Sequence, residues 1–235
     1  MLEIKRLNAG YGDVQILWDI DLKVQPKSIT ALIGSNGAGK TTLLRSIFGT
    51  LKPYSGDIVF EGTPITELPY TVRSTVQITM IPEGRQLFGG LSVENNLLMG
   101  AYSRKDRNGI KRDLAWVYAI FPRLRDRRKQ TSGTLSGGEA QMCAIGRGLM
   151  ADPKFLMIDE LSLGLAPLAV EELLGVLTEI QSEKGLTILM VDQDVQTALE
   201  ISSTGYVLVN GRIEMTGDSK TLLKDPEIQK AYLGL

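Results

Sequence analysis

Residues 34–42 read Gly34-Ser35-Asn36-Gly37-Ala38-Gly39-Lys40-Thr41-Thr42, and this stretch decides the fold. It follows an apolar run at residues 29–33 and leads into a helical pattern of apolar residues. A strand, a loop of the form G-x-x-x-x-G-K-[ST] and a helix, in that order, make the phosphate-binding P-loop. The glycines let successive backbone N–H groups face phosphate oxygens, and the start of the helix adds the positive end of its dipole. We therefore expect residues 34–42 to bind a nucleoside triphosphate, with Lys40 at its β- and γ-phosphates and Thr41 on Mg²⁺.

The composition is typical of a globular domain, because 43% of the 235 residues are hydrophobic and 23% are charged. This length predicts one domain. A formal net charge of −1 provides no global field for nucleic acid or an anionic membrane, and no run reaches the roughly 18 apolar residues of a membrane span. The single cysteine, Cys143, excludes an internal disulfide and fits a reducing cytosol. Since the chain has no histidine, any general base or metal ligand must come from other residue types.

Alternating and continuous apolar runs predict most of the other elements. Ile20, Leu22 and Val24 alternate with polar residues, which predicts antiparallel strands within residues 2–24. Continuous apolar runs at residues 155–158 and 187–191 are typical of parallel strands that are buried on both faces. The further elements that we expect are strands at residues 57–62 and 76–81, a mostly helical segment at 88–150 with Ser92 as a cap, a helix at 170–182, a hairpin at 207–215 that turns at Asn210-Gly211, and a last helix that starts at Asp225-Pro226.

Two neighbouring carboxylates, Asp159 and Glu160, end the apolar run at residues 155–158. An aspartate at the tip of a strand beside the P-loop strand can hold Mg²⁺ through water, as in the Walker B element. The next carboxylate, Glu160, is placed to polarise the water that attacks the γ-phosphate. Downstream of a P-loop, the pair predicts hydrolysis of the bound nucleotide rather than binding alone.

The segment Leu135-Ser136-Gly137-Gly138-Glu139 precedes a helical pattern. A serine and two glycines at a helix start offer a hydroxyl and backbone donors to an anion, although a simple helix cap has the same composition. In sequence with the P-loop and the Asp159-Glu160 pair, this segment resembles the signature of ABC transporters. From end to end the chain is similar to the ATPase subunits of that family, with the elements in the family order.

The resemblance implies an α/β fold, namely a P-loop NTPase (RecA-like) core with a mainly parallel sheet, an antiparallel β subdomain and an inserted α-helical subdomain. It implies one ABC ATPase domain over residues 1–235, with the helical subdomain at about 88–150. It assigns Tyr11 to stacking on adenine, against the alternative of a core or edge aromatic. It assigns Ser136, Gly137 and Gly138 to the γ-phosphate of ATP that is held by a second copy.

The resemblance also implies partners. The family works as a head-to-tail pair of ATPase subunits that closes over two ATPs, so a second ATPase subunit is expected, in a homodimer or a heterodimer. Two transmembrane permease subunits are expected on the helical subdomain, and a substrate-binding protein acts indirectly through them. The chain is then peripheral, at the cytoplasmic face of the cell membrane, and no nucleic-acid partner is expected.

Within the family, the chain is similar to the LivF-type ATPase of branched-chain amino-acid importers. Urea and short-amide importers have close relatives of this subunit, and a non-transport ABC ATPase or an ATP-binding subunit without turnover are further alternatives. The stretches that carry the similarity are Ile81-Pro82-Glu83-Gly84-Arg85, Asn96-Leu97-Leu98-Met99-Gly100-Ala101-Tyr102, Asp159-Glu160-Leu161-Ser162-Leu163-Gly164-Leu165-Ala166-Pro167 and Ala231-Tyr232-Leu233-Gly234.

The chain departs from the common family pattern at several positions. Glu83 stands where most ABC ATPases have glutamine, and the resemblance places it at the Mg²⁺ site. Gln193 stands where most have the histidine that contacts the γ-phosphate. A glutamine can still donate a hydrogen bond there but cannot carry a proton, so slow hydrolysis at this P-loop is expected. Leu161 replaces a proline, Ala140 a glutamine and Ala166 an aspartate, which puts the usual contact between subunits in doubt at Ala166.

Overall fold

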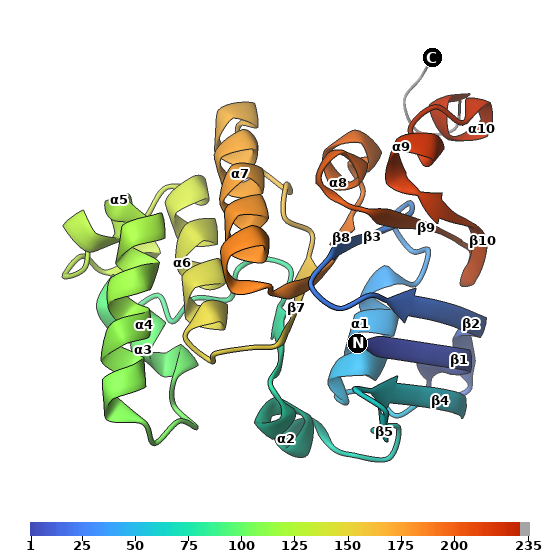
Figure 1. Cartoon of the computed structure of the whole chain (residues 1–235), viewed down its shortest axis with the longest axis horizontal. Helices are drawn as coiled ribbons and strands as arrows, with labels where there is room; N and C mark the ends of the chain where they lie inside the picture. Colours follow the sequence, from blue (N-terminus) through green and yellow to red (C-terminus); the bar gives the residue numbers. More distant parts are fainter. Residues whose placement is uncertain (231–235) are drawn as a thin grey trace.

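The computed structural model describes residues 1–230, so the predicted family ending at residues 231–234 lies outside the described part. Its centre is a six-stranded sheet in the order β10-β9-β3-β8-β7-β6 (Figure 1). Neighbouring strands from β9 to β6 run parallel, and only β10 is antiparallel to its neighbour, which confirms the α/β class with a mainly parallel sheet. The strands are β3 (Ile29–Ile33), β6 (Ile78–Ile81), β7 (Phe155–Asp159), β8 (Thr187–Asp192), β9 (Thr204–Val209) and β10 (Arg212–Asp218).

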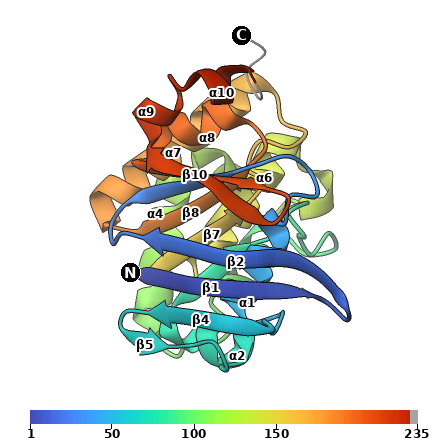
Figure 2. The ribbon, with the colours of Figure 1, turned by 90° about the vertical axis from the view of Figure 1, so that its right-hand side faces the viewer.

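A second, antiparallel sheet has the order β2-β1-β4-β5 (Figure 2). The strands are β1 (Leu2–Tyr11), β2 (Val14–Val24), β4 (Ser55–Phe60) and β5 (Thr63–Pro64), so the expected strands within residues 2–24 are confirmed. β1 pairs with β2 and with β4, and Leu2 lies opposite Val24 on one side and opposite Phe60 on the other. Alternate residues of β1 are buried, because only one face of this sheet packs on the protein interior.

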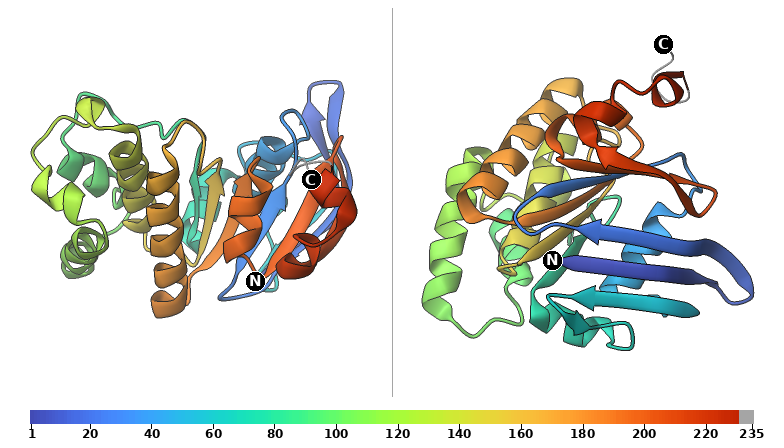
Figure 3. Two further views of the ribbon diagram at one scale, coloured as in Figure 1. Left: turned by 90° about the horizontal axis from the view of Figure 1, so that it is seen from above. Right: turned by 45° about the vertical axis from the view of Figure 1, so that its right-hand side comes forward.

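The helices separate into those beside the sheets and those beyond β7 (Figures 1 and 3). Residues 88–150 hold α3 (Val93–Gly100), α4 (Arg107–Ile120), α5 (Pro122–Asp126), the 3₁₀ turn η2 (Ser132–Thr134) and α6 (Gly137–Leu149). The other helices are α1 (Lys40–Phe48), α2 (Tyr70–Arg73), the 3₁₀ turn η1 (Ser74–Val76), α7 (Pro167–Lys184), α8 (Val195–Ile201), α9 (Ser219–Leu222) and α10 (Pro226–Ile228). No helix within residues 1–230 is long and apolar enough to cross a membrane.

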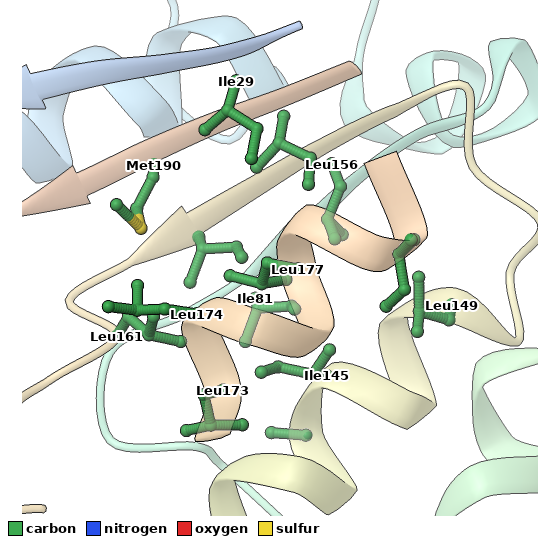
Figure 4. Packing of buried hydrophobic residues seen from close by; sticks show 14 of the residues in the cluster. Ile29, Ile81, Ile145, Leu149, Leu156, Leu161, Leu173, Leu174, Leu177 and Met190 are labelled. Carbon is green, nitrogen blue, oxygen red and sulfur yellow. The ribbon is translucent and has the colours of Figure 1, made fainter. Parts of the chain in front are cut away.

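Two hydrophobic clusters cover the two faces of the parallel sheet. In the first, α7 packs between the sheet and α6, and its Leu173 and Leu177 are fully buried (Figure 4). In the second, Leu43, Leu44 and Ile47 of α1 pack between the parallel sheet and the antiparallel strands. Since both faces are covered, β7 and β8 are buried along their whole length, as the continuous apolar runs at residues 155–158 and 187–191 predict.

Local signals account for several element ends. Ser92 caps α3 by accepting from the Asn95 N–H, and Asp225 caps α10, so both predicted caps are confirmed. The β9–β10 hairpin turns at Asn210-Gly211 with φ of 46° and 77°, also as predicted. The predicted strand at residues 76–81 starts only at Ile78, because Gln77 has a left-handed φ of 66° that interrupts extended backbone.

Candidate functional site

The carboxyl ends of the parallel strands bring the predicted site residues to one edge of the sheet. β3 leads into the P-loop, β7 ends at Asp159, β8 ends at Asp192, and β6 leads into Glu83. These strands are neighbours in the order β3-β8-β7-β6. In open parallel sheets such an edge is where ligands bind. The sheet therefore places the P-loop beside Glu83 and beside Asp159 and Asp192, which are more than a hundred positions away in sequence.

The P-loop glycines are required by close approaches and by backbone conformation. A Cβ on Gly34 would lie 2.4 Å from the Leu208 carbonyl oxygen of β9. Gly37 and Gly39 have φ of 81° and 110°, which side chains disfavour, and Gly39 is the N-cap of α1. Ala38 N–H donates to the Ser35 carbonyl, and Gly211 N–H donates to the Ala38 carbonyl. The loop is thus fixed against the hairpin with its curvature preformed.

Gly34→Ala is expected to displace this loop, because the added methyl cannot share space with the Leu208 carbonyl. We expect a destabilisation of about 1–3 kcal/mol and a clear loss of ATP affinity. Thermal unfolding and binding of a fluorescent ATP analogue measure the two effects. Gly62→Ala is the matched control, since a Cβ at Gly62 would meet no atom of the described residues within 4 Å and would add only the strain of a φ of 80°. A Gly34→Ala protein that binds the analogue as tightly as this control would contradict the assignment.

Lys40 lies inside the curve of the loop. Its ammonium donates to the carbonyl oxygens of Gly34 at 2.8 Å and of Ser35 at 3.1 Å, and it lies 3.5 Å from the Glu160 carboxylate. The lysine and glutamate side chains are only 5% and 7% exposed. The first helical bond of α1 runs from Leu43 N–H to the Gly39 carbonyl, so the preceding N–H groups have no partner within the helix. A buried cation and free backbone donors together suit a polyphosphate.

Asp159 is a buried carboxylate at the site whose pKa is raised. It is 1% exposed, and within residues 1–230 neither carboxylate oxygen has a hydrogen-bond partner. Burial raises its pKa to about 6; the nearby Thr41 hydroxyl opposes the rise, and the Glu160 and Glu83 carboxylates add to it. An unpartnered buried carboxylate is costly unless a cation compensates it. Asp159 therefore fits a metal ligand.

Thr41, Asp159 and Glu83, the residues expected at Mg²⁺, line one cavity of about 430 Å³. They reach it from the start of α1, the end of β7 and the loop after β6, respectively. Hydroxyl and carboxylate oxygens are the ligands that Mg²⁺ prefers, and this cation usually keeps several waters. The cavity is completed by Arg45, Phe48, Thr50, Met80, Pro82 and Gln86.

Glu160 and Gln193 are in direct contact. The Gln193 side-chain amide donates to both Glu160 carboxylate oxygens, at 2.7 and 2.6 Å. Glu160 has a left-handed φ of 56°, and its N–H donates to the Val191 carbonyl of β8. Strained backbone of this kind persists where the surroundings hold it, often at functional sites. The two predicted catalytic residues are thus brought together, and the glutamine amide lies on the glutamate.

Asp192 and Ser162 are neighbours of the site that the sequence analysis missed. Asp192 is 1% exposed and accepts from the Ser162 N–H and hydroxyl, at 3.1 and 2.8 Å. It also accepts from the N–H groups of Gln193 and Asp194. This carboxylate joins the loop after Glu160 to the loop that carries Gln193. Its position at the end of an apolar strand, the same pattern as Asp159, was the available signal.

Ser136 caps α6 in a reciprocal capping box. Its hydroxyl oxygen accepts from the Glu139 N–H, while the Ser136 N–H donates to the Glu139 carboxylate, which also pairs with Arg127 at 2.6 Å. The helix-cap interpretation is therefore correct for the local structure. α6 and α1 lie on opposite sides of β7 (Figures 1 and 3), so one chain does not bring its own signature to its own P-loop.

Tyr11 ends β1 and is 43% exposed. Its hydroxyl oxygen accepts a 3.1 Å hydrogen bond from Arg45, which lies one turn into α1 after the P-loop. The ring is thus held beside the helix that the P-loop starts, and it is not a core aromatic.

Comparison with known proteins agrees with this geometry. The sequence pattern of the ABC transporter family matches residues 17–162. The chain is 41% identical to the high-affinity branched-chain amino acid transport ATP-binding protein BraG of Pseudomonas aeruginosa, covering 100% of both chains. It is 40% identical to the probable branched-chain amino acid transport ATP-binding protein LivF of Archaeoglobus fulgidus, covering 100% of this chain and 99% of that protein. A solved nucleotide-free ATP-binding cassette from an ABC transporter superposes with a TM-score of 0.87 at 26% identity, covering 100% and 99%. The chain therefore belongs to the ABC transporter family and is an ATPase of its ATP-binding cassette type.

Proposed function

We propose that this chain is the ATP-hydrolysing subunit of an importer for branched-chain amino acids. The full-length identity of 41% and 40% to two transport ATP-binding proteins for these substrates supports the substrate class. These relatives favour neither a urea importer nor a non-transport ABC ATPase. The observation that carries the catalytic part is the contact of buried Lys40 with Glu160, which joins the P-loop to a potential base. A subunit that binds ATP without turnover has no use for that base.

Each predicted residue has a role in holding ATP and Mg²⁺. The backbone of Gly34, Ser35, Asn36, Gly37, Ala38, Gly39 and Thr42 faces the phosphates, Lys40 contacts the β- and γ-phosphates, and Tyr11 stacks on the adenine. Thr41, Asp159 and Glu83 would hold Mg²⁺, since they line one cavity and Asp159 has no other partner within residues 1–230. When bound, Mg²⁺ neutralises charge on the β- and γ-phosphate oxygens.

Glu160 acts as the general base in this proposal. It accepts a proton from the water that attacks the γ-phosphate, and it must be held in hydrogen-bond reach of that water. Gln193 supplies the orientation, because its amide donates to both carboxylate oxygens. Its amide does not titrate near neutral pH, so it positions the base and takes no part in proton transfer.

Gln193→Ala is expected to lower kcat by about tenfold, since the Glu160 carboxylate then keeps, among residues 1–230, only its 3.5 Å ion pair with Lys40. The KM for ATP should change little, because the P-loop keeps its contacts. Steady-state hydrolysis at several ATP concentrations separates the two constants. Gln196→Ala, on the exposed face of the neighbouring helix, is the control. An unchanged kcat in the Gln193 variant would show that Glu160 needs no such support.

A second ATPase subunit completes the site. Ser136, Gly137 and Gly138 form the start of α6, the helix that lies on the far side of β7 from α1 (Figure 1), so they serve the ATP of another subunit in a head-to-tail pair. That subunit is either another copy or a related chain. Ala166 stands where the family usually has the aspartate that contacts the other subunit. Within this chain, the loop at residues 161–166 is held by the hydrogen bond from Ser162 to Asp192.

The membrane partners are two permease subunits, reached through the helical segment α3–α6. Apolar side chains are exposed there, with Phe88 at 48%, Met99 at 39% and Tyr102 at 85%. Phe88 and Met99 also line a cavity of about 360 Å³ beside Gln86. Exposed apolar patches of this kind mark protein interfaces. The chain then sits peripherally at the cytoplasmic face of the membrane, and the permeases receive substrate from a binding protein.

Uptake by the reconstituted transporter tests the substrate. The chain, its permeases and its binding protein are placed in vesicles with ATP on the side of this subunit, and radiolabelled leucine or urea is supplied on the other side. We expect ATP-dependent uptake of leucine and none of urea. Uptake of urea alone would replace the substrate class, and uptake of leucine without ATP would contradict the role of this subunit.

A further inference from the structure

The segment after β6 has an unusual backbone. Gly84, Arg85 and Gln86 are consecutive residues with φ of 74°, 64° and 42°. Left-handed conformations cost free energy at Arg85 and Gln86, where a Cβ is present. Such a bend persists only when other contacts hold it. Glu83, at the start of the bend, lines the cavity that also contains Thr41 and Asp159.

Arg147 of α6 holds the bend from the helical side. Its guanidinium donates to the Gln86 carbonyl at 2.7 Å and to the Arg85 carbonyl at 2.9 Å, and it lies 5.6 Å from the centre of the Phe88 ring. Two charge-assisted hydrogen bonds to adjacent carbonyls fix the peptide planes as well as their position. The bend is therefore attached to the helix that begins with the signature.

The Arg85 side chain extends from this bend to two other segments. Its Nε donates to the Gln141 side-chain oxygen on α6 at 3.3 Å, and its Nη2 donates to the Leu163 carbonyl at 3.3 Å. The same Nη2 would lie 3.5 Å from a Cβ on Gly137, the first glycine of the signature. One guanidinium thus joins the loop after Glu160 to the signature helix, and its own backbone continues to Glu83.

We propose that Arg85 is a positioning residue for ATP hydrolysis. It holds the signature and the loop at residues 161–166 in fixed positions relative to the segment that begins at Glu83. The signature and this loop are the two segments that the subunit presents to its partner. This inference rests on the proposed pairing of ATPase subunits. A change at the metal cavity that moves Glu83 moves Arg85 with it, and so reaches the nucleotide of the partner. The planar guanidinium has separate donors for the Gln141 side chain and for the Leu163 carbonyl, whereas lysine has a single ammonium group, so lysine cannot replace Arg85.

The test uses the assembled transporter and compares Arg85→Ala and Arg85→Lys with the control Arg6→Ala, an exposed arginine on β1 of the antiparallel sheet. Steady-state hydrolysis gives kcat, the KM for ATP and the cooperativity between sites. We expect both Arg85 variants to lose at least about tenfold in kcat, with KM changed by less than about twofold and with cooperativity lost. The control should match the unmodified transporter.

Several outcomes would overturn the inference. Unchanged kcat and cooperativity in Arg85→Ala would show that the contacts carry no coupling. Full activity in Arg85→Lys would show that a positive charge alone is sufficient. If the Arg85 variants lose turnover only because their melting temperature or their affinity for a fluorescent ATP analogue falls, Arg85 stabilises the fold and does not position groups for hydrolysis. Gln141→Leu removes one acceptor and is expected to give part of the same loss. If the unmodified transporter does not hydrolyse ATP, the proposed function fails; if it does and the variants equal it, only this inference fails.

Discussion

Glu160→Gln is expected to lower turnover at this chain's P-loop by about 10²–10⁴-fold, the usual contribution of a general base. The amide is nearly isosteric, so the Gln193 side chain keeps an oxygen to bind at this position. ATP affinity should be retained or increase, because Lys40 loses its competing 3.5 Å ion pair with the carboxylate. The expected result is thus a protein that binds ATP and does not hydrolyse it.

The measurement is ADP formed per bound ATP. It uses purified chain at high concentration, together with the related ATPase subunit if the proposed partner is not a second copy. Glu200→Gln, an exposed glutamate on α8, is the matched control and should hydrolyse ATP normally. If turnover in the Glu160 variant equals that of the control, Glu160 is not the base. In that case a subunit that binds ATP without hydrolysing it becomes the better interpretation.

Asp159→Asn is expected to have opposite effects on stability and on activity. In the absence of metal, the buried unpartnered carboxylate destabilises the fold, and replacing it should raise the free energy of unfolding at pH 7.5 by about 1–3 kcal/mol. With Mg²⁺ and ATP, the variant should lose turnover by about 10²-fold or more, since the carboxylate proposed to hold the metal has been removed. In the unmodified chain, we expect ATP with Mg²⁺ to raise the melting temperature more than ATP alone does. The Asp159→Asn variant should lack this additional rise.

The raised pKa of Asp159 determines how the stability of the unmodified chain depends on pH. The folded-state pKa of Asp159 is raised from 3.8 to about 6, so the folded chain binds more protons than the unfolded chain between these values. This group therefore makes stability fall as pH rises from about 4 to about 6, with no further change above. Asp159→Asn should flatten that part of the profile in thermal unfolding with EDTA present. A variant that is less stable than the parent at pH 7.5 without metal would contradict the account.

The sequence was sufficient for the parts of the site that depend on local pattern. Lys40 and Thr41 follow from one contiguous loop, and Asp159 from a strand that ends in a carboxylate. Their proximity was predictable because parallel strands end at one edge. Ser92, Asp225 and the Asn210-Gly211 turn were also predictable, since the side chains that cap or turn the chain act within a few residues.

Contacts between loops far apart in sequence could not be predicted. The bonds from Gln193 to Glu160 and from Ser162 to Asp192 depend on loop conformations, including the left-handed Glu160, that no periodicity records. The start of α7 at Pro167 rather than at 170 was available from proline's preference for the first helical position. Arg85 gave no sign of its role, because its partners Gln141 and Leu163 are on other elements.

The most direct test of whether this chain powers import is the rate of ATP hydrolysis by the assembled transporter. The rate is measured once with leucine-loaded binding protein and once with the same protein empty. If this chain powers import, the loaded protein should raise the hydrolysis rate severalfold over the empty one. Equal rates with loaded and empty binding protein, at ATP concentrations that saturate the site, would contradict the account.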